Sequence, residues 1–351
     1  MKVGIAFSGG GLRGAYQVGA YKAFRDLNIK VDGFVGTSIG AFNACMCASG
    51  KFLELYDFWS NMDAGEILGF SKELVDSANH DKIDVIEILK NIKNIISNRG
   101  ISTIGLKEKL KEFHLEKYLY ESKKDFGLVT VRFNDFKPRY MLKKDIDKKH
   151  LNEYILASCY LPVFKLEKMI DNNYYLDGGF HDYIPANMLI NMGYDKVYVI
   201  DLEAIGLRRP YKDRKKIIVI KPRKKLYNIL DFKKKDIDEM IKMGYYDTLK
   251  EVGDFDGKKY IFKKRRKWYY KYLLKYVDKD IVYSMSKLFG TKDEKRLVIK
   301  VVEYVMKKER FTYYNVYRIK DVIKRIRFTR IDSDVYKFVK SLGGNYNGKS
   351  L

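Results

Sequence analysis

The stretch from Val31 to Cys47 reads VDGFVGTSIGAFNACMC. It opens as a short apolar run, passes through Gly-Thr-Ser-Ile-Gly at residues 36–40, and continues in small apolar residues that suit a buried helix. A strand, a tight turn and a helix in this order place the central serine on a sharp bend with its hydroxyl exposed. Ser38 is therefore a candidate nucleophile, and Gly36 and Gly40 flank it because a Cβ would collide in so tight a turn. The same residues also suit a glycine-rich turn that only packs a strand against a helix.

A second glycine-rich loop precedes this stretch and reads Gly9-Gly10-Gly11-Leu12-Arg13-Gly14. It follows a predicted strand and opens a predicted helix, so its backbone amides can surround an anion. One interpretation is a phosphate or nucleotide site. However, no Gly-Lys-Ser/Thr follows, and Asp32 precedes the second strand, whereas a dinucleotide site needs an acidic residue at that strand's end. The other interpretation is an oxyanion hole beside Ser38.

A third glycine motif, Asp177-Gly178-Gly179, follows an apolar strand. A carboxylate on such a turn can approach another backbone closely, as the base for a serine must. An ordinary Asp-Gly hairpin turn is the alternative.

Taken together and in this order, the three motifs resemble those of the patatin-like phospholipases, which are lipid acyl hydrolases. The resemblance extends to Ala157–Pro162, to Asp231-Phe232 and to Gly244–Asp247, and so covers about residues 1–250. It implies a Ser–Asp dyad in which Ser38 is the nucleophile and Asp177 the base. One departure is that Tyr183 stands where the family usually carries an asparagine. The remaining implied site residues are the oxyanion-hole glycines Gly9, Gly10 and Gly11 and the supporting residues Arg13, Gly36, Gly40, Gly178 and Gly179.

The chemistry that the resemblance implies is acyl transfer. A serine hydroxyl is a weak nucleophile until a base takes its proton, and a carboxylate is a weak base unless a water-poor cleft raises its pKa. Histidine is the usual partner of a serine, and His181 is the one histidine near Asp177 in the sequence. The family's dyad needs no third member, and we expect no metal or other cofactor.

Strands alternate with helices along the first 250 residues, which predicts an α/β fold of three layers with a mostly parallel central sheet flanked by helices. The predicted strands are 2–8, 31–36, 127–133, 139–142, 164–170, 174–176, 197–202 and 217–220, with hairpins across 134–138 and 171–173. The predicted helices are 12–27, 38–47, 52–59, 83–96, 106–113, 152–158, 185–192 and 229–252. Residues 62–105 are a candidate cover for the cleft.

The positive charge is confined to the C-terminal part of the chain. The 351 residues carry 69 Lys and Arg against 45 Asp and Glu, but residues 1–207 hold 27 of each. We predict an acyl hydrolase domain at 1–252 and a basic, mainly α-helical extension at 253–351. In this extension Leu297, Val298, Val301, Val302, Val305 and Met306 show the clearest helical spacing.

A basic extension rich in aromatic residues suits an anionic membrane surface. Lysine and arginine attract anionic head groups, and Trp268, Tyr269, Tyr270 and Tyr272 are residues that favour the head-group boundary. Nucleic acid, bound through Lys320, Lys324, Arg325, Arg327 and Arg330, is the less favoured partner. A docking platform for a protein, or a solvated face in a lysine-rich chain, is also open.

Three cysteines, Cys45, Cys47 and Cys159, are too few for a disulfide framework, so we expect a reduced, cytoplasmic setting. Polar residues and glycines interrupt the longest uncharged run, Gly33–Gly50, so we expect a soluble protein or one peripheral on a membrane. The leading prediction is a phospholipase A or lipid acyl hydrolase acting on membrane phospholipids or lysophospholipids. The alternatives are a general carboxylesterase or thioesterase, and a non-enzymatic scaffold that binds nucleic acid or membranes.

Overall fold

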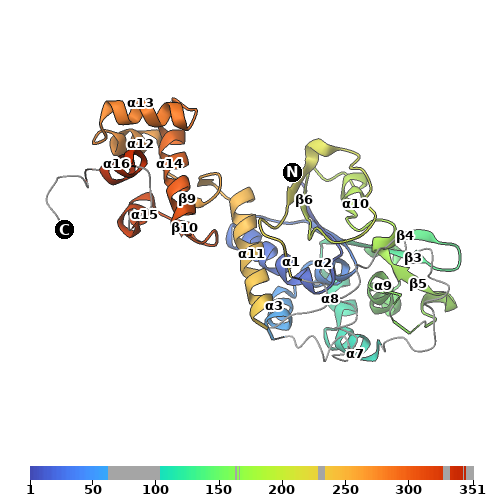
Figure 1. The fold of residues 1–351 in the computed structure, drawn as a ribbon. Helices are drawn as coiled ribbons and strands as arrows, with labels where there is room; N and C mark the ends of the chain where they lie inside the picture. The colour runs from blue at the N-terminus through green and yellow to red at the C-terminus, as the bar shows by residue number, and fades with distance from the viewer. Residues whose placement is uncertain are drawn as a thin grey trace. The chain divides into compact units, whose positions relative to one another are not determined.

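The computed structural model describes residues 1–61, 103–162, 164–165, 167–227, 234–326, 333–342 and 344. The chain divides into two compact units, Met1–Thr248 and Leu249–Leu351 (Figure 1). Our assignment of an acyl hydrolase domain ending at residue 252 stays a prediction. The predicted helix at 83–96, the Asp231-Phe232 pair and nearly all of the candidate cover at 62–105 lie outside the described residues.

A mostly parallel sheet forms the centre of the first unit. In the described residues it has seven strands, ordered β4-β3-β2-β1-β6-β7, with β5 paired to β3. All pairs from β3 to β7 along this order are parallel, whereas β4 and β5 run antiparallel to β3. The bounds are β1 Val3–Phe7, β2 Gly33–Thr37, β3 Asp125–Arg132, β4 Lys137–Leu142, β5 Tyr175–Asp177, β6 Lys196–Ile200 and β7 Ile217–Ile220.

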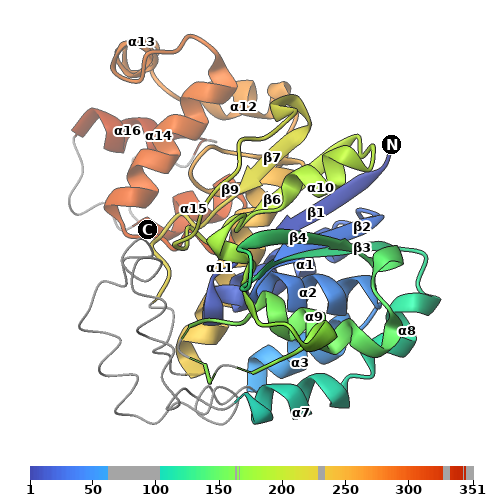
Figure 2. The same ribbon diagram turned by 90° about the vertical axis from the view of Figure 1, so that its right-hand side faces the viewer.

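Helices cover both faces of this sheet, which is why β1 and β2 are buried along their whole length. On one face α1 packs its Tyr21 and Phe24 rings against Phe34 and Tyr198. On the other face lies α10 (Figure 2). Its Leu189 fills the space beside Gly4. The bounds are α1 Gly14–Asp26, α2 Ile39–Ala48, α3 Phe52–Asn61, α7 Ile104–Glu112, α8 Leu115–Glu121, α9 Leu151–Ser158, α10 Ala186–Asn191 and α11 Lys234–Val252. The predicted three-layer α/β fold is confirmed.

One predicted hairpin is wrong. Residues 164–170 and 174–176 were expected to pair across the turn at 171–173. The turn forms, with the Met169 amide donating to the Asn173 carbonyl at 2.8 Å, but the pairing stops there. Residues Tyr175–Asp177 pair with β3 instead, because β3 offers a longer edge whose residues are already buried in the sheet.

The second unit is mainly helical, as predicted. Its core gathers around α14, where the predicted apolar stripe from Leu297 to Met306 is buried. Its helices are α12 Lys267–Leu274, α13 Lys279–Leu288, α14 Glu294–Lys308, α15 Ile319–Arg325 and α16 Ser333–Ser341. Three short strands that the sequence patterns did not predict form a small sheet in the order β10-β9-β8, namely β8 Phe255–Asp256, β9 Ile261–Lys263 and β10 Val316–Tyr317.

The turn between β8 and β9 is held by a side chain from α14. Glu303, only 4% exposed, accepts hydrogen bonds from the amides of Lys258, Lys259 and Tyr260 at 2.6, 2.6 and 3.0 Å. Three donors on one carboxylate oxygen satisfy a buried charge that would otherwise be costly. Among the described helices, none is both long and apolar enough to cross a bilayer.

Helices α1 and α11 touch through their backbones. A Cβ on Gly19 would lie 1.8 Å from the Ile241 carbonyl oxygen, and a Cβ on Gly244 would lie 1.9 Å from that of Tyr16. No side chain fits at either position, so the two helices can approach this closely only because both residues are glycine.

We predict that Gly244→Ala lowers the free energy of unfolding by about 1–3 kcal/mol, because the helices must separate to admit the methyl group. Chemical denaturation of the full chain measures this. Lys242→Ala, an exposed position on the same helix, is the matched control and should change stability by less than about 0.5 kcal/mol. Equal stability of the Gly244→Ala variant and the wild type would contradict the observed packing.

Candidate active site

Ser38 lies at a sharp bend between β2 and α2. Its φ is 57° and its ψ is −135°, a conformation that costs about 1–3 kcal/mol for a residue with a side chain. A Cβ on Gly36 would lie 2.1 Å from the Gly40 carbonyl oxygen, and a Cβ on Gly40 would lie 2.5 Å from that of Ser8. The bend therefore needs both flanking glycines. Helix α2 begins at Ile39, directly after Ser38.

Ser158, at the end of α9, holds the bend in place. The Ser38 amide donates to the Ser158 hydroxyl at 2.9 Å, and that hydroxyl donates to the Val129 carbonyl of β3 at 2.6 Å. Ser158 is fully buried. Sequence reasoning included this residue in the segment shared with the patatin-like phospholipases but gave it no role. Its only sequence signal is a hydroxyl in a run of small residues before Pro162.

Asp177 ends β5 and reaches the serine from the neighbouring strand. The residue is 4% exposed, and the Ser38 side chain lies close enough to its carboxyl to lower the pKa of that group. The carboxylate also accepts from the Gly179 amide at 2.7 Å. A Cβ on Gly178 would lie 2.2 Å from the Val129 carbonyl oxygen, so this turn too depends on glycine. The structure thus brings together the two side chains to which the sequence resemblance gives the roles of nucleophile and base.

Burial raises the pKa of Asp177 to about 6, although the hydrogen bonds from Ser38 and Gly179 act in the opposite direction. This shift follows from placing a carboxylate away from water, which disfavours its charged form. At neutral pH the group is still mostly ionised, and it binds a proton more strongly than an exposed aspartate does. The sequence predicted a shift in this direction.

The first glycine loop lies against the serine bend, since a Cβ on Gly9 would be 3.4 Å from the Ser38 Cβ. The Gly9 amide, however, donates to the Tyr183 carbonyl at 2.9 Å. It is therefore not free to bind an oxyanion, which corrects one of the three predicted donors. The amides of Gly10 and Gly11 have no acceptor within the described part of the chain, so they are the loop's available donors.

In the described residues, the side-chain contact of Arg13 is with Tyr227 and not with Ser38 or Asp177. Its Nε donates to the Tyr227 carbonyl at 2.8 Å, and burial lowers the pKa of its guanidinium. Arg13 therefore connects the first glycine loop to the segment that follows β7.

A buried network of polar side chains is hydrogen-bonded to the carbonyls of Ser8 and Gly14, at the two ends of the first glycine loop. Asn43 of α2 donates to the Gly14 carbonyl and to Gln17 at 3.1 and 2.8 Å, and it accepts from the Trp59 indole at 3.0 Å. Gln17 in turn donates to the Ser8 carbonyl at 2.7 Å. No motif in the sequence indicated these residues, because a single asparagine or glutamine in a helix carries no spacing signal.

Two other residues near the dyad have distinct surroundings. His181 contacts Arg209 at 2.8 Å and the edge of the Tyr140 ring; burial and this cation lower its pKa. Cys159 lies beside Ser38 and near Asp177, and burial raises the pKa of its thiol well above the usual value. Cys159 entered the sequence analysis only in the count of cysteines, whereas the structure places its thiol beside Ser38.

Comparison with known proteins gives one family. The model of the patatin-like phospholipases matches residues 5–190. Lysophospholipase nte1 of Aspergillus terreus is 24% identical over 212 residues, and that of Aspergillus fumigatus is 23% identical over the same length. The match covers 59% of this chain but only 12% of each relative.

Two solved structures share similarity over nearly the whole chain. VipD from Legionella pneumophila is 13% identical, with a TM-score of 0.47, and the match covers 98% of this chain and 85% of VipD. ExoU, in its complex with SpcU from the type III secretion system of Pseudomonas aeruginosa, is 12% identical, with a TM-score of 0.32 and coverage of 97% and 70%.

We predict that Asp177→Asn stabilises the fold by about 3 kcal/mol at pH 8 and by much less at pH 4. An acid whose pKa is higher in the folded protein binds more protons when folded, so the wild type loses stability as pH rises from about 4 to about 6. The asparagine variant lacks this loss. The difference between the two melting curves across this pH range measures it.

Asp135 provides a control of opposite sign, because its hydrogen bond with Arg132 holds the pKa of that carboxyl well below its usual range. Asp135→Asn should not stabilise the protein at any pH above 4. A difference between wild type and Asp177→Asn that does not change with pH would contradict the burial of an ionised Asp177.

Proposed function

The chain belongs to the patatin-like phospholipase family, and from this premise we propose that it is a serine acyl hydrolase that cleaves fatty-acyl esters of membrane phospholipids or lysophospholipids. The observation that carries the proposal is the placement of the Ser38 side chain beside the buried carboxyl of Asp177. It lies beside two glycine amides without a protein acceptor in the described residues. The lysophospholipase relatives favour lysophospholipids among the candidate substrates.

The proposed reaction has two acyl-transfer steps. The Ser38 hydroxyl oxygen attacks the ester carbonyl while Asp177 takes its proton, and the carbonyl oxygen becomes an oxyanion held by the amides of Gly10 and Gly11. Collapse of this intermediate breaks the bond to the alcohol, which leaves with the proton from Asp177. Water then attacks the acyl-serine carbonyl while Asp177 takes one of its protons. Collapse of this second intermediate breaks the bond to the Ser38 oxygen, which receives that proton from Asp177, and the fatty acid leaves with the water oxygen and its remaining hydrogen.

Asp177 can act alone as the base because its surroundings compensate for the missing histidine. Burial raises its pKa towards 6, so proton transfer from serine is less unfavourable than it would be to an exposed carboxylate. The Ser38 amide donates to the Ser158 hydroxyl at 2.9 Å, which fixes the backbone that carries the nucleophile and so contributes to its positioning.

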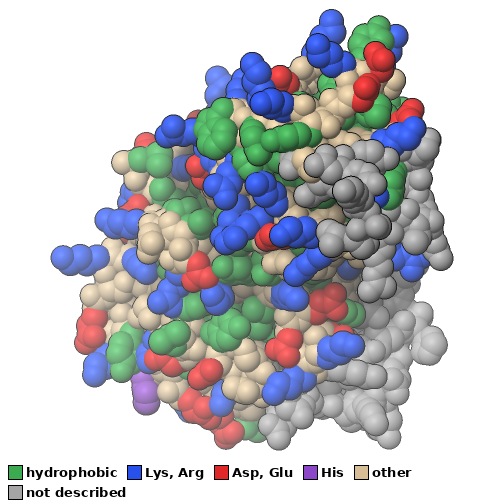
Figure 3. Space-filling view, turned by 90° about the vertical axis from the view of Figure 1, so that its left-hand side faces the viewer, with side chains coloured by type: hydrophobic (Ala, Val, Ile, Leu, Met, Phe, Trp, Pro, Cys, Tyr) green, Lys and Arg blue, Asp and Glu red, His purple; other side chains and the backbone are tan. Residues whose placement is uncertain are grey.

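The second unit supports the proposed membrane setting. Residues 249–351 carry 28 Lys and Arg against 12 Asp and Glu, a surplus that favours anionic lipid surfaces. On the face drawn in Figure 3, Lys and Arg side chains gather beside exposed hydrophobic ones. Trp268 and Tyr283 are 66% and 62% exposed, as befits residues at a head-group boundary.

We predict that a fluorophosphonate probe labels the wild type at Ser38 and that Ser38→Ala abolishes labelling. Hydrolysis of lysophosphatidylcholine should fall at least about a thousand-fold in the same variant, because the acyl-enzyme cannot form. Ser122→Ala is the matched control and should keep both, because Ser122 precedes the end of β3 that pairs with Gly33, at the far end of β2 from Ser38. Labelling that persists in Ser38→Ala would remove the proposed nucleophile. Comparing lysophospholipid, diacyl phospholipid, short-chain ester and thioester substrates then separates a lipase from a general esterase or thioesterase.

We predict that kcat/KM for a soluble short-chain ester rises tenfold per pH unit below about 6 and is level above it, because only ionised Asp177 can accept the proton. Asp182 tests the assignment, since burial raises the pKa of this second buried carboxyl to about 6 as well. Asp182→Asn should retain the acid limb, whereas Asp177→Asn should abolish turnover. If Asp182→Asn lost the acid limb, the limb would report the ionisation of Asp182, and its assignment to Asp177 would be wrong.

A further inference from the structure

A pocket of about 770 Å³ lies within the second unit. Its walls come from the segment after β9, from α12 and from the start of α15. Six of the lining side chains are cationic, and Asp321 is the acidic one. The cations are Lys263, Lys264, Arg265, Arg266, Arg318 and Lys320. A concave site of this size can hold a small ligand, and its charge selects an anion.

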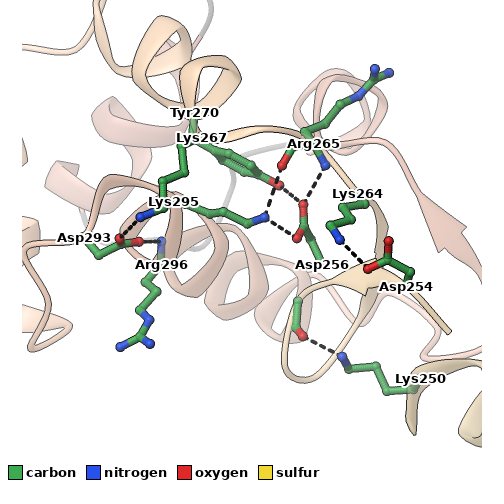
Figure 4. Close-up of polar contacts among 11 residues, drawn as sticks. Lys250, Asp254, Asp256, Lys264, Arg265, Lys267, Tyr270, Asp293, Lys295 and Arg296 are labelled. Atoms are coloured by element: carbon green, nitrogen blue, oxygen red, sulfur yellow. Dashed lines mark hydrogen bonds and ion pairs between the residues drawn. The ribbon is translucent and has the colours of Figure 1, made fainter. Parts of the chain in front are cut away.

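The backbone that carries these cations is held rigidly from beneath. Asp256, 7% exposed, accepts from the Arg265 amide at 2.8 Å and from the Tyr270 hydroxyl at 2.7 Å, and it pairs with Lys295. Lys295 also donates to the Arg265 carbonyl at 3.1 Å. Figure 4 shows this cluster on one side of Arg265 and the Arg265 guanidinium pointing away from it. The pocket is therefore preorganised, which lowers the entropic cost of binding.

Most of the cations have no carboxylate partner of their own. Lys264 pairs with Asp254 at 2.5 Å. Across the described ranges, no carboxylate forms an ion pair within 4.0 Å with the side-chain nitrogens of Lys263, Arg265, Arg266, Arg318 or Lys320. Five cations without an ion pair, set against the single carboxylate of Asp321, repel one another around one hollow. A ligand carrying more than one phosphate relieves that repulsion.

Exposed aromatic side chains border the same pocket. Trp268 is 66% exposed and Tyr272 is 44% exposed, and the Arg265 guanidinium lies 5.6 Å from the Tyr269 ring centre. Tryptophan and tyrosine beside cations are typical of a surface that rests on lipid head groups. This combination favours a membrane lipid over a free phosphate compound, which needs no exposed tryptophan.

We propose that the pocket binds the phosphorylated head group of an anionic membrane lipid that carries more than one phosphate. Arg266, Arg318 and Lys320 contact the phosphates, and Trp268 enters the head-group layer. The proposal rests on the proposed function, because it supplies the hydrolase with a lipid surface. Binding at this pocket is nevertheless a separate property from turnover at Ser38.

The test is co-sedimentation of the full chain carrying Ser38→Ala, so that no substrate is consumed. The vesicles are phosphatidylcholine alone, phosphatidylcholine with phosphatidylserine, and phosphatidylcholine with phosphatidylinositol bisphosphate, the last two matched in total charge. We expect the strongest binding to the phosphoinositide vesicles. Replacing Arg266, Arg318 and Lys320 by glutamine should weaken that binding about a hundred-fold, at about 1 kcal/mol for each cation lost.

The matched control replaces Lys279, Lys292 and Lys307 by glutamine, which removes the same charge from exposed positions that do not line the pocket. It should weaken binding less than about threefold. Equal losses in the two triple variants, or equal binding to the two anionic vesicles, would show a diffuse charge effect and overturn the proposal. Stronger binding to RNA than to vesicles, or to soluble inositol trisphosphate but to no vesicle, would reassign the pocket to another ligand and overturn it as well.

Turnover distinguishes a failure of this proposal from a failure of the proposed function. The pocket variant with Ser38 intact should hydrolyse a soluble short-chain ester at the wild-type rate. All three replaced side chains are exposed, so the variant should also melt at the wild-type temperature. Normal ester turnover with unchanged vesicle binding would refute the pocket alone, whereas vesicle binding without any ester turnover in the wild type would refute the hydrolase alone.

Discussion

Three backbone contacts that leave no room for a methyl group hold the site together. The carbonyl oxygens of Gly40, Ser8 and Val129 lie 2.1, 2.5 and 2.2 Å from where Cβ atoms on Gly36, Gly40 and Gly178 would be. These contacts bring the ends of β1, β2 and β3 within reach of one another. The hydroxyl of Ser38, the carboxylate of Asp177 and the free amides of the glycine loop can meet only because of this proximity.

The departure at Tyr183 shows that the backbone, rather than the side chain, supports the glycine loop at that point. The Tyr183 carbonyl accepts from Gly9, whereas its hydroxyl donates to Asp201 at 3.2 Å on the other side. Any residue with a carbonyl in this position can receive the Gly9 amide. The hydrogen bond to the Gly9 amide therefore does not depend on the family's usual asparagine side chain.

Local features of the site were predictable, and long-range ones were not. The spacing of glycines around Ser38 specified the bend, because a tight turn is dictated by adjacent residues. Asp177 was reached only through the family resemblance, since Asp-Gly-Gly also suits a hairpin turn. The bond from Ser38 to Ser158 and the bond from Gly9 to Tyr183 join segments more than a hundred residues apart. The prediction of a hairpin between 164–170 and 174–176 failed for the same reason. Residues 175–177 pair with β3, which is distant in the sequence, and not with the adjacent segment.

The position of Glu303 also bears on how the second unit assembles. Its carboxylate accepts hydrogen bonds from the amides of Lys258, Lys259 and Tyr260, which are 43 to 45 residues away in the sequence. The turn between β8 and β9 therefore lacks its acceptor until α14 has formed and docked. Contacts of such separation carry a large loop-closure entropy and form late. The turn precedes β9 and the basic pocket segment along the chain, yet in folding it should become ordered only after the helix that follows them.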